Sequence, residues 1–431
     1  MHIFSVVFLN DSERLNTDQR ILANAYNSHY LYNDNNVGPQ VVRHFIFEKP
    51  LTLMFKKICI GILGGGQLAK MSTLAASRLG FEVAIMEKEM RSPAGQLTHN
   101  ESIGWVDDEL VMKSFIHHCD VVTLENEFVD HHRIEFFEQL GKRVFPSSTT
   151  IGLIQDKLLQ KKTLKKNKIP VPEFLEVREK QTFQEISAKL GVPFILKSRK
   201  MGYDGYGNAV VHDEKEFHAG VKHLSNRHNN LMAESFVDFS MELAVMVART
   251  VHEIKTYPVV QTIQKNHICH TVIAPAQIPK HIAQHAEEIA IASVKAVKGF
   301  GIFGVEMFLG NDSSIIVNEM APRPHNSGHY TIEACVTSQF ENHIRSVLEL
   351  PLGSTEMLKP HAVMINLLGK MHPQHSQEMY RVALEHPNAH LHVYGKESSR
   401  VGRKMGHVTI VGDNLAKILK EATAIEAKIS L

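Results

Sequence analysis

The stretch GILGGGQLAKM, at residues 61–71, constrains the fold of this chain more than any other feature of the sequence. An apolar run precedes it and a helix-like run follows it. Gly64, Gly66 and Ala69 fit the G-x-G-x-x-[G/A] pattern of a tight strand-to-helix turn. Glu87 ends the next apolar run about 20 residues further on, as an acid does in dinucleotide-binding folds. The pattern predicts a Rossmann-like α/β unit, and it raises a dinucleotide-dependent oxidoreductase or redox sensor as one hypothesis.

Length and composition indicate an ordinary globular protein of two or three domains. The chain has 431 residues, of which 22% are charged, and a formal net charge of +1. This balance gives no reason to expect nucleic acid or an anionic membrane as a partner. No apolar run reaches the ~18 residues that a membrane span needs. We therefore expect no nucleic-acid partner and no membrane partner.

Cysteine and histidine usage favours a cytoplasmic protein without a histidine-rich metal centre. The cysteines are widely spaced and form no C-x-x-C motif, as is typical of reduced thiols; they are Cys59, Cys119, Cys269 and Cys335. Histidines are frequent, but there is no H-E-x-x-H motif and no Cys/His cluster. We interpret the pairs His117-His118 and His131-His132 as solvated helix residues rather than as metal ligands.

Three domains are predicted after a dissimilar N-terminal segment. Residues 1–56 lack periodic patterning, and we expect either a poorly ordered extension or a natural start at Met54. Residues 57–150 alternate about four strands with helices, which predicts an open α/β domain. A mixed α+β domain follows at 151–347 and opens on one basic helix, IGLIQDKLLQKKTLKKNK. Residues 348–431 predict a small mixed α/β domain.

A second glycine-rich segment, MGYDGYGN at 201–208, lies between two short apolar runs and follows Lys197. Backbone N–H groups of such a loop can close over phosphates, and a lysine on the preceding strand can reach phosphate oxygens. A glycine-rich hairpin beside an exposed lysine fits this segment equally well. Further along, Glu234 and Glu242 stand where a strand edge could bind adenine and ribose, but glutamate on strand edges is common.

Paired carboxylates in GVEMFLGNDSSIIVNEM are the strongest chemical signal in the chain. The turn at 310–314 predicts a hairpin, and pairing across it puts Glu306 opposite or next to Asn318 and Glu319. Two carboxylates on apolar strands would repel each other unless a divalent cation neutralised them. Oxygen ligands of this kind suit Mg²⁺ held together with nucleotide phosphates. The alternative is a surface hairpin with solvated glutamates, although its strands are apolar on both faces.

The segment APRPHNSGH follows this hairpin directly. Two prolines stiffen it and crowd Arg323, His325 and Asn326 beside the predicted cation site. These side chains could hold a small anion and stabilise developing charge. A structural arginine paired with an acid, together with a capping asparagine, is the alternative.

This combination of motifs resembles the ATP-grasp enzymes and, among them, the N5-carboxyaminoimidazole ribonucleotide synthetases of purine biosynthesis. The resemblance covers about residues 57–431. Its most specific part is the RPHNSGH block followed by SQFE, and it also includes TLENE, LKSRKMGYDGYGN, HAVMINLLG and GKESSRVGRKMGH. It implies a Rossmann-like pre-ATP-grasp domain, an ATP-grasp domain and a small C-terminal domain. The implied reaction converts ATP, bicarbonate and 5-aminoimidazole ribonucleotide into ADP, phosphate and the N5-carbamate through carboxyphosphate.

The resemblance also implies roles for individual residues. The implied ATP-binding residues are Lys157, Lys197, Gly202, Tyr203, Asp204, Gly205, Tyr206, Gly207, Asn208, Glu234, Ser235, Phe236, Val237, Glu242, Gln264, Asn318 and Glu319. The implied ligands of Mg²⁺, or of Mn²⁺ in its place, are Glu306 and Glu319. The implied bicarbonate and carboxyphosphate pocket consists of Arg323, His325 and Asn326. The implied ribonucleotide-binding residues are Gln67, Glu125, Tyr203, Asp204, Lys396 and Arg403. A homodimer is implied as well.

In such a family the glycine turn at 61–71 belongs to a dinucleotide-like fold that no longer binds a dinucleotide. Its glycines permit the tight turn, the helix N-terminus can face the anionic ribonucleotide, and Glu87 is a strand-end residue. Two positions depart from the family pattern: Gln264 stands where histidine is usual, and Lys157 where arginine is frequent.

Three other classes stay open. A formate-dependent glycinamide ribonucleotide transformylase or a biotin-carboxylase-like enzyme would keep the ATP-grasp fold, but the GKESSRVGRKMGH block argues against both. A dinucleotide-dependent oxidoreductase leaves the carboxylate hairpin and the APRPHNSGH segment unexplained. A catalytically inactive nucleotide-binding scaffold conflicts with the full set of acidic and cationic positions.

Overall fold

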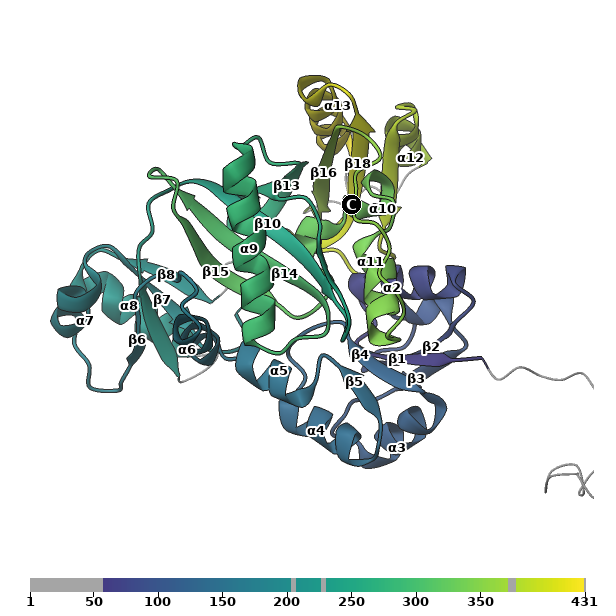
Figure 1. Cartoon of the computed structure of the whole chain (residues 1–431), viewed down its shortest axis with the longest axis horizontal. Coiled ribbons are helices and arrows are strands. Elements are labelled where there is room, and N and C mark those ends of the chain that lie inside the picture. Colours follow the sequence, from purple (N-terminus) through teal and green to yellow (C-terminus); the bar gives the residue numbers. More distant parts are fainter. Residues whose placement is uncertain (1–56, 203–206, 226–229, 371–376, 430–431) are drawn as a thin grey trace, which may run out of the picture. The chain divides into compact units, whose positions relative to one another are not determined.

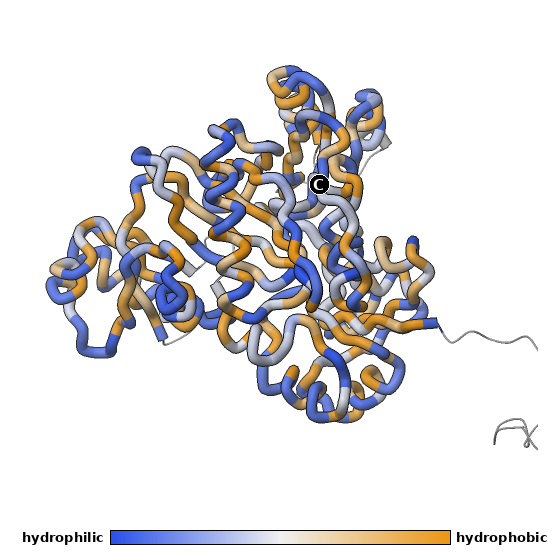
Figure 2. Tube along the Cα trace, viewed as in Figure 1, coloured by the Kyte–Doolittle hydropathy of each residue, from blue (hydrophilic) through white to orange (hydrophobic). Residues whose placement is uncertain are grey.

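The computed structural model describes residues 57–202, 207–225, 230–370 and 377–429 (Figure 1). The expectation about residues 1–56 lies outside these ranges, as do the predicted ligands Tyr203, Asp204, Gly205 and Tyr206. Among the described residues, no helix is both long and apolar enough to cross a membrane. Figure 2 shows hydrophobic residues running along the strands of the sheets and along the helices that cover them.

The first sheet is entirely parallel, with strand order β3-β2-β1-β4-β5. This sheet and its helices comprise β1 (Cys59–Leu63), α2 (Gln67–Arg78), β2 (Glu82–Glu87), η1 (Gly95–Leu97), β3 (Asn100–Ile103), α3 (Glu109–His118), β4 (Val121–Leu124), α4 (His131–Gln139), β5 (Arg143–Phe145) and α5 (Ser148–Ile154). Alternate residues of β1 pack against α3 on one face and against α2 on the other, which explains its continuous apolar run. The sequence predicted about four strands, because the fifth, β3, is a polar edge strand that reads NESI.

The second sheet has four antiparallel strands in the order β6-β9-β7-β8. It comprises β6 (Phe174–Val177), α7 (Phe183–Leu190), β7 (Phe194–Ser198), β8 (Asn208–Val211), α8 (Glu214–Ser225) and β9 (Leu231–Ser235). The two helices pack Ile186, Phe217 and Leu224 against the strands. The register pairs Lys197 with Met232 and Glu234 with Ile195, so both charged residues stand on neighbouring strands.

The third sheet runs in the order β15-β14-β10-β12-β13-β16-β18-β17, and β11 pairs with β10. Its elements are β10 (Phe239–Arg249), β11 (Ile254–Thr256), β12 (Val260–Lys265), β13 (Ile268–Ala274), α9 (Lys280–Ala296), β14 (Gly301–Gly310), β15 (Ile315–Ala321), η2 (Asn326–Gly328), α10 (Thr331–Ala334), α11 (Gln339–Val347), β16 (His361–Leu368), α12 (Gln377–Leu384), β17 (Ala389–Val393), β18 (Lys404–Gly412) and α13 (Leu415–Lys428). The pairing of β13 with β16 carries this sheet across the predicted domain boundary at residue 347. The mixed α/β and α+β fold class predicted from the sequence is confirmed.

The sequence predicted a single basic helix after residue 150, and this prediction is wrong. The segment forms two helices, α5 and α6 (Lys157–Lys166), with Gln155 and Asp156 between them. The Asp156 carboxylate accepts hydrogen bonds from the backbone N–H groups of Leu158 (2.9 Å) and Leu159 (3.3 Å) and so caps α6. The same carboxylate pairs with Arg199 at 2.6 Å, which ties the start of α6 to the end of β7.

Candidate active site

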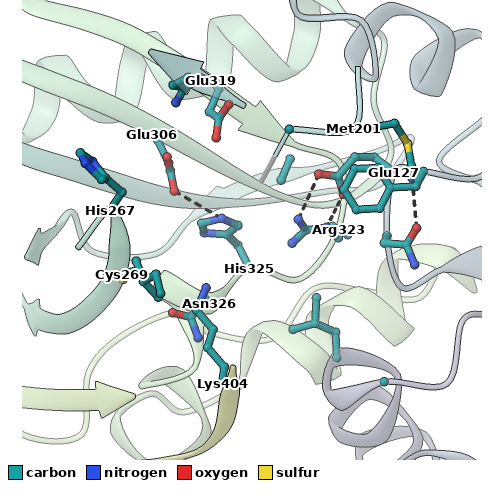
Figure 3. A pocket seen from close by; sticks show the side chains of 18 of the residues that line it. Glu127, Met201, His267, Cys269, Glu306, Glu319, Arg323, His325, Asn326 and Lys404 are labelled. Atoms are coloured by element: carbon teal, nitrogen blue, oxygen red, sulfur yellow. Dashed lines mark hydrogen bonds and ion pairs between the residues drawn. The ribbon is translucent and has the colours of Figure 1, made fainter. Parts of the chain in front are cut away.

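One cavity of about 1220 Å³ collects residues from all three predicted domains (Figure 3). It is lined by these predicted site residues: Gln67, Glu125, Lys157, Lys197, Gly202, Asn208, Glu234, Ser235, Phe236, Val237, Glu242, Gln264, Glu306, Asn318, Glu319, Arg323, His325, Asn326, Lys396 and Arg403. Gly207 is the one predicted and described residue outside the lining. Its backbone packs closely on Gly202, where an added Cβ would lie 2.7 Å from the Gly202 Cα. The two ends of the phosphate-loop candidate therefore meet.

The carboxylate hairpin forms with the register that the sequence predicted. Glu306 on β14 lies directly opposite Glu319 on β15, and Met307 lies opposite Val317. Asn318, which lies between Val317 and Glu319 on β15, is the extra residue of a β-bulge. A bulge turns a side chain out of strict alternation, which is how Asn318 and Glu319 can both line the cavity although they are neighbours in sequence.

The two carboxylates have opposite electrostatic surroundings. Burial and the neighbouring Glu319 raise the pKa of Glu306 to about 8. Burial would also raise the pKa of Glu319, but Lys157, which forms a short ion pair with it, and Lys197 bring that pKa down to about 2. Two carboxylates and the Asn318 amide oxygen are a donor set that fits a hard divalent cation. Such an ion would also remove the repulsion that raises the pKa of Glu306.

A buried charge cluster lies beneath the predicted phosphate lysine. Glu234 is 2% exposed, and its carboxylate lies 2.8 Å from the Lys197 ammonium and 3.3 Å from the Lys161 ammonium. Lys197 also donates to the Asn318 Oδ1 at 3.1 Å. The Glu234 side chain is therefore committed to two lysines, which leaves only its backbone, with that of Ser235 to Val237, to face an adenine. Lys161 donates to the Val317 carbonyl at 3.1 Å, and burial lowers its pKa to about 8.

Gln264 contacts the predicted ribose ligand. Its Nε2 donates to the Glu242 carboxylate at 2.8 Å, and both residues line the cavity. Burial raises the pKa of Glu242, and the bond from Gln264 opposes that shift. The Gln264 amide is a neutral hydrogen-bond donor, and its bond holds the Glu242 carboxylate in place.

The anion-pocket candidates are held by residues of other elements. Glu127, which follows β4, accepts from the Arg323 guanidinium through two bonds, one of them 3.0 Å long (Figure 3). Gly304 on β14 leaves room for His325, because a Cβ there would lie 2.6 Å from the His325 Cβ. The Gln339 side chain accepts from the His325 N–H at 2.9 Å and donates to its carbonyl at 2.7 Å.

The surroundings of His325 disfavour its protonated form. Burial, together with Arg323 and Lys404, lowers its pKa to about 3. Its Nε2 lies 3.4 Å from the Glu306 carboxylate, and its Nδ1 lies 2.8 Å from the Ser327 hydroxyl. The expectation that His325, with Arg323, could hold a small anion and stabilise developing charge stays a prediction.

Asn326 is paired with an asparagine from the C-terminal segment. Its amide exchanges hydrogen bonds with fully buried Asn366, at 2.9 Å and 2.5 Å. Asn366 also donates to the Cys269 carbonyl at 2.9 Å. The amide pair fixes the floor of the pocket, and Lys404 lies beside it (Figure 3).

The glycine turn holds a carboxylate of the same domain at the N-terminus of α2. That this N-terminus can face the anionic ribonucleotide stays a prediction, and the Glu125 carboxylate lies there in the structure. Glu125 accepts from the N–H groups of Gly66 (2.5 Å) and Leu68 (3.2 Å). Burial, followed by the charge of Glu87, raises the pKa of Glu125, and these helix bonds oppose that shift. Glu87 likewise accepts from the Gly65 N–H at 2.9 Å. The donors that would hold a pyrophosphate are therefore already used by side chains of the same domain.

The predicted ribonucleotide phosphate ligands come from the loop between β17 and β18. The Lys396 ammonium donates to the Lys404 carbonyl at 2.7 Å and lies 5.6 Å from the centroid of the Tyr394 ring. Arg403 donates to the Ser398 carbonyl at 2.8 Å. Both line the cavity on the side of the first domain that carries Gln67 and the segment from Glu87 to Pro93.

Four further residues contact the site and escaped the sequence reasoning: Glu127, Lys161, Asn366 and Lys404. Asn366 is a polar residue inside the apolar run VMINLL, and Lys161 stands one turn after Lys157 in a helix that carries several lysines. Asn366 was visible as a polar residue in an apolar pattern, whereas nothing in the sequence separates Lys161 from the exposed lysines of the same helix.

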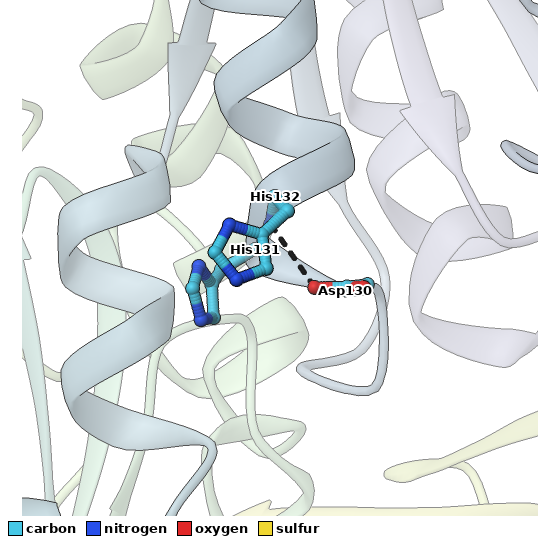
Figure 4. A group of neighbouring side chains, drawn as sticks. All are labelled: Asp130, His131 and His132. Atoms are coloured by element: carbon cyan, nitrogen blue, oxygen red, sulfur yellow. Dashed lines mark hydrogen bonds between the residues drawn. The ribbon is translucent and has the colours of Figure 1, made fainter.

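The group Asp130, His131 and His132 has donor atoms within 4.8 Å of one another (Figure 4). The Asp130 carboxylate accepts from the His132 N–H at 3.0 Å and caps α4. A helix N-terminus repels cations, and nearby Lys200 is among the causes that lower the pKa of His131, after burial. His132 is exposed and His131 is partly buried, so the interpretation of the pair as solvated helix residues stays a prediction.

Three protein families match successive parts of the chain. Residues 57–155 match the ribonucleotide synthetase preATP-grasp domain, residues 162–340 the ATP-grasp domain, and residues 362–421 the phosphoribosylaminoimidazole carboxylase C-terminal domain. These matches follow the same order as the three domains expected from the sequence.

Relatives and solved structures agree on one family. The chain is 39% identical to the N5-carboxyaminoimidazole ribonucleotide synthase of Synechococcus elongatus, over 81% of this chain and 89% of that protein. It is 44% identical to the phosphoribosylaminoimidazole carboxylase of Ogataea methanolica, over 85% of this chain and 69% of that protein. The chain spans about two thirds of the length of the yeast relatives that bear this second name.

Among solved structures, carboxyaminoimidazole ribonucleotide synthase from Aspergillus clavatus complexed with ATP is similar, with a TM-score of 0.81 and 37% identity over 86% of this chain and 99% of that one. The same enzyme in complex with ADP and 5-aminoimidazole ribonucleotide gives a TM-score of 0.80 and 36% identity, over 86% of this chain and 99% of that one. The chain belongs to the N5-carboxyaminoimidazole ribonucleotide synthase family of ATP-grasp ligases.

Proposed function

We propose that the chain carboxylates 5-aminoimidazole ribonucleotide at its exocyclic amine at the expense of ATP. A bicarbonate oxygen attacks the γ-phosphorus, which releases ADP and forms carboxyphosphate. The amine then attacks the carboxyl carbon, the carbon–oxygen bond to phosphate breaks, and the amine loses a proton. The products are ADP, phosphate and N5-carboxyaminoimidazole ribonucleotide. Phosphorylation is needed because bicarbonate itself is a poor electrophile.

The observation that carries this proposal is the meeting, in one cavity, of a carboxylate pair beside two lysines with an arginine–histidine pocket. Phosphoryl transfer needs the first group and a small anion needs the second. The reported ligands of the Aspergillus clavatus enzyme, ATP in one structure and ADP with 5-aminoimidazole ribonucleotide in another, support the same assignment by homology.

At the nucleotide end, Lys157 and Lys197 bind phosphate oxygens. The segment from Gly202 to Asn208, of which 203–206 lie outside the described residues, is assigned to the phosphates from the family resemblance. The backbone from Glu234 to Val237 receives the adenine, and Glu242, oriented by Gln264, receives the ribose. Glu234 and Lys161 neutralise each other below Lys197 and hold its ammonium toward the cavity. Closure of a loop over the site would keep water from the carboxyphosphate anhydride.

Glu306 and Glu319, with Asn318 beside them, would hold Mg²⁺, or Mn²⁺ in its place. When bound, the cation neutralises the phosphate oxygens and orients the γ-phosphate for in-line attack. Their opposed register on β14 and β15 and the raised pKa of Glu306 support this assignment.

At the anion end, Arg323 supplies a fixed positive charge for bicarbonate and then for carboxyphosphate. His325 contributes a neutral N–H, and Asn326 shapes the pocket floor through its pairing with Asn366. Lys404 lines the same pocket and adds a second positive charge. Two fixed cationic groups beside a neutral donor suit a small, doubly charged intermediate.

At the ribonucleotide end, Lys396 and Arg403 bind the 5′-phosphate, while Gln67 and Glu125 face the aminoimidazole. Tyr203 and Asp204 complete this end in the proposal and lie outside the described residues. Gln67 and Glu125 follow β1 and β4, and their position at the carboxyl ends of these parallel strands agrees with the rule that open α/β sheets bind ligands there.

We further propose a cytoplasmic homodimer with domains at 57–150, 151–347 and 348–431. The four cysteines all lie among the described residues, where they are buried and form no disulfide, which fits a reducing compartment. The homodimer rests on the family resemblance alone. The family matches at 57–155, 162–340 and 362–421 support the domain limits.

The test is phosphate release from Mg-ATP with and without 5-aminoimidazole ribonucleotide and bicarbonate. Release that requires both co-substrates is the expected result. Release stimulated instead by glycinamide ribonucleotide with formate would keep the fold and change the substrate. Tight NAD binding without phosphate release would return the chain to the oxidoreductase hypothesis.

A further inference from the structure

The turn that carries Lys396 is held by side chains from the first domain. Three successive backbone carbonyls at the end of β17 accept bonds from that domain. The Lys70 ammonium on α2 donates to the carbonyls of Val393 (3.1 Å) and Tyr394 (3.0 Å). The Gln96 side chain on η1 donates to the carbonyl of Gly395 (3.1 Å). The next residue along the chain is Lys396.

The turn is shaped to accept these two side chains. Gly395 has φ +78°, a left-handed conformation that favours glycine. A Cβ at Gly395 would lie 3.3 Å from both the Gln96 Oε1 and the Lys70 Nζ. The fit therefore depends on a glycine at the point where the first domain touches the turn.

Apolar packing supports the same contact. Tyr394 is 1% exposed and packs with Leu68 and Met71 of α2. Its hydroxyl lies 2.9 Å from the His407 Nδ1, and its backbone N–H donates to the Met405 carbonyl at 3.0 Å. One helix thus packs on the Tyr394 ring and binds the Tyr394 carbonyl through Lys70. Burial lowers the pKa of Lys70, as expected for an ammonium withdrawn from water.

Neither Lys70 nor Gln96 lines the cavity, whereas Lys396 and the segment from Arg400 to Lys404 do. Gln96 also donates to the carbonyl of Arg91 at 2.9 Å, and Arg91 itself lines the cavity. Any effect of Lys70 and Gln96 on a ligand must therefore pass through the backbone that they hold.

We propose that Lys70 and Gln96 are positioning residues for the ribonucleotide 5′-phosphate site: they fix the Val393–Gly395 backbone so that Lys396 meets the phosphate. The proposal rests on the proposed function for the identity of the ligand. The bonds themselves belong to the ligand-free chain and can be tested without turnover.

The experiment compares the unaltered full chain with Lys70→Met, Lys70→Arg and Gln96→Leu, and the matched control is Lys113→Met, which alters an exposed lysine on α3. The first readout is the apparent KM for 5-aminoimidazole ribonucleotide, with kcat and the Kd for Mg-ATP. Lys70→Met and Gln96→Leu should raise this KM about tenfold, with kcat within about twofold and ATP affinity unchanged. Lys70→Arg keeps the charge and donors and should restore most of the loss. Lys396→Ala, which removes the phosphate ligand itself, sets the upper limit of the effect.

The second readout is backbone hydrogen exchange of residues 389–404 in the ligand-free protein. Lys70→Met and Gln96→Leu should speed exchange at Tyr394 and its neighbours, and Lys113→Met should not. An unchanged KM in both variants, with or without faster exchange, would overturn the positioning role. If the unaltered chain showed no ribonucleotide-dependent turnover, the proposed function would fall. In that case, unchanged exchange of residues 389–404 in Lys70→Met and Gln96→Leu would still show that these two side chains do not hold the turn.

Discussion

Glu319 lies opposite Glu306 across two strands and forms an ion pair with Lys157, so its carboxylate is ionised and directed into the cavity. Replacing Glu319 with Gln removes one charge from the proposed cation site with almost no change in shape. Turnover should fall by about 10²-fold or more, and raising Mg²⁺ should recover part of it.

The control for this substitution is Glu173→Gln, which alters an exposed carboxylate paired with Lys165 at 2.8 Å. Steady-state phosphate release at several Mg²⁺ concentrations measures both variants. Normal turnover in Glu319→Gln at limiting Mg²⁺ would remove this residue from the cation site.

Glu127 is a second single residue whose replacement should change catalysis, because its carboxylate holds Arg323. It forms a two-bond pair with Arg323, and both side chains are less than one fifth exposed. Glu127→Gln keeps the volume but weakens the hold on the guanidinium. We expect kcat/KM for bicarbonate to fall roughly tenfold or more, with the KM for ATP unchanged.

Glu349→Gln is the matched control for Glu127→Gln, since Glu349 pairs with Arg143 at 3.2 Å on the surface. Equal bicarbonate kinetics in the two variants would show that Arg323 needs no carboxylate to hold it.

At the scale of the elements, the turn between β1 and α2 is built around the Glu125 carboxylate. Gly64 has φ +104°, and a Cβ there would lie 2.8 Å from the Glu125 Cβ and Oε2. Gly80 also has a positive φ, +82°, but an added Cβ would meet no atom within 4 Å. Gly64→Ala should therefore lose about 2 kcal/mol more unfolding free energy than Gly80→Ala.

Urea denaturation of the two variants measures this difference, since both share the backbone penalty of a positive φ. Equal losses would mean that Glu125 does not sit tightly in the turn and that its helix bonds are dispensable.

The elements also mark the limit of prediction from sequence. The apolar runs in the sequence predicted β1, β2, β4, β10, β14 and β15, because a buried strand needs apolar side chains at its buried positions. The periodicity could not reveal that α5 ends at Ile154 and that Asp156 caps α6, since the apolar spacing runs on from α5 into α6 without a glycine or proline between them. It also missed β3, whose polar sequence is stabilised by an edge position that only the assembled sheet provides.

For the candidate site, the sequence indicated which residues lie close together when they are neighbours in one hairpin, whereas it did not indicate which residues pair across domains. Glu306 and Glu319 were found because a short turn fixes their register. Glu127 and Arg323 are 196 residues apart, and no local pattern connects them. The contact of the Glu125 carboxylate with the N-terminus of α2 was likewise hidden, because a glycine turn that binds a phosphate and one that binds a carboxylate have the same sequence pattern.

At the scale of the whole molecule, α11 joins the sheets through a buried histidine. The His343 Nε2 lies 2.9 Å from the Thr123 hydroxyl on β4, and α11 packs against both α2 and β14. Burial lowers the pKa of His343 to about 4, below the ~6.5 of an unfolded chain. The unfolded state therefore binds one more proton between these values, and the stability of the chain falls as the pH drops from about 6.5 to about 4.

His343→Gln should flatten this acid dependence by about one proton, although the variant starts from a lower stability at neutral pH. Unfolding free energies measured by urea at several pH values between 4 and 7 give the slope. An unchanged slope would mean that other groups, such as buried His329 and His407, whose pKa values burial also lowers, govern the acid response.

The central claim is that the residues of one cavity catalyse the phosphorylation of bicarbonate by ATP and the transfer of its carboxyl group to the amine of the ribonucleotide. The most direct test uses ¹⁸O-labelled bicarbonate in a short incubation with Mg-ATP and 5-aminoimidazole ribonucleotide, followed by mass spectrometry of the released phosphate. If carboxyphosphate forms, the attacking bicarbonate oxygen stays with phosphorus, and each phosphate should carry one ¹⁸O. Phosphate whose new oxygen comes only from water would contradict the claim and reduce the chain to an ATPase.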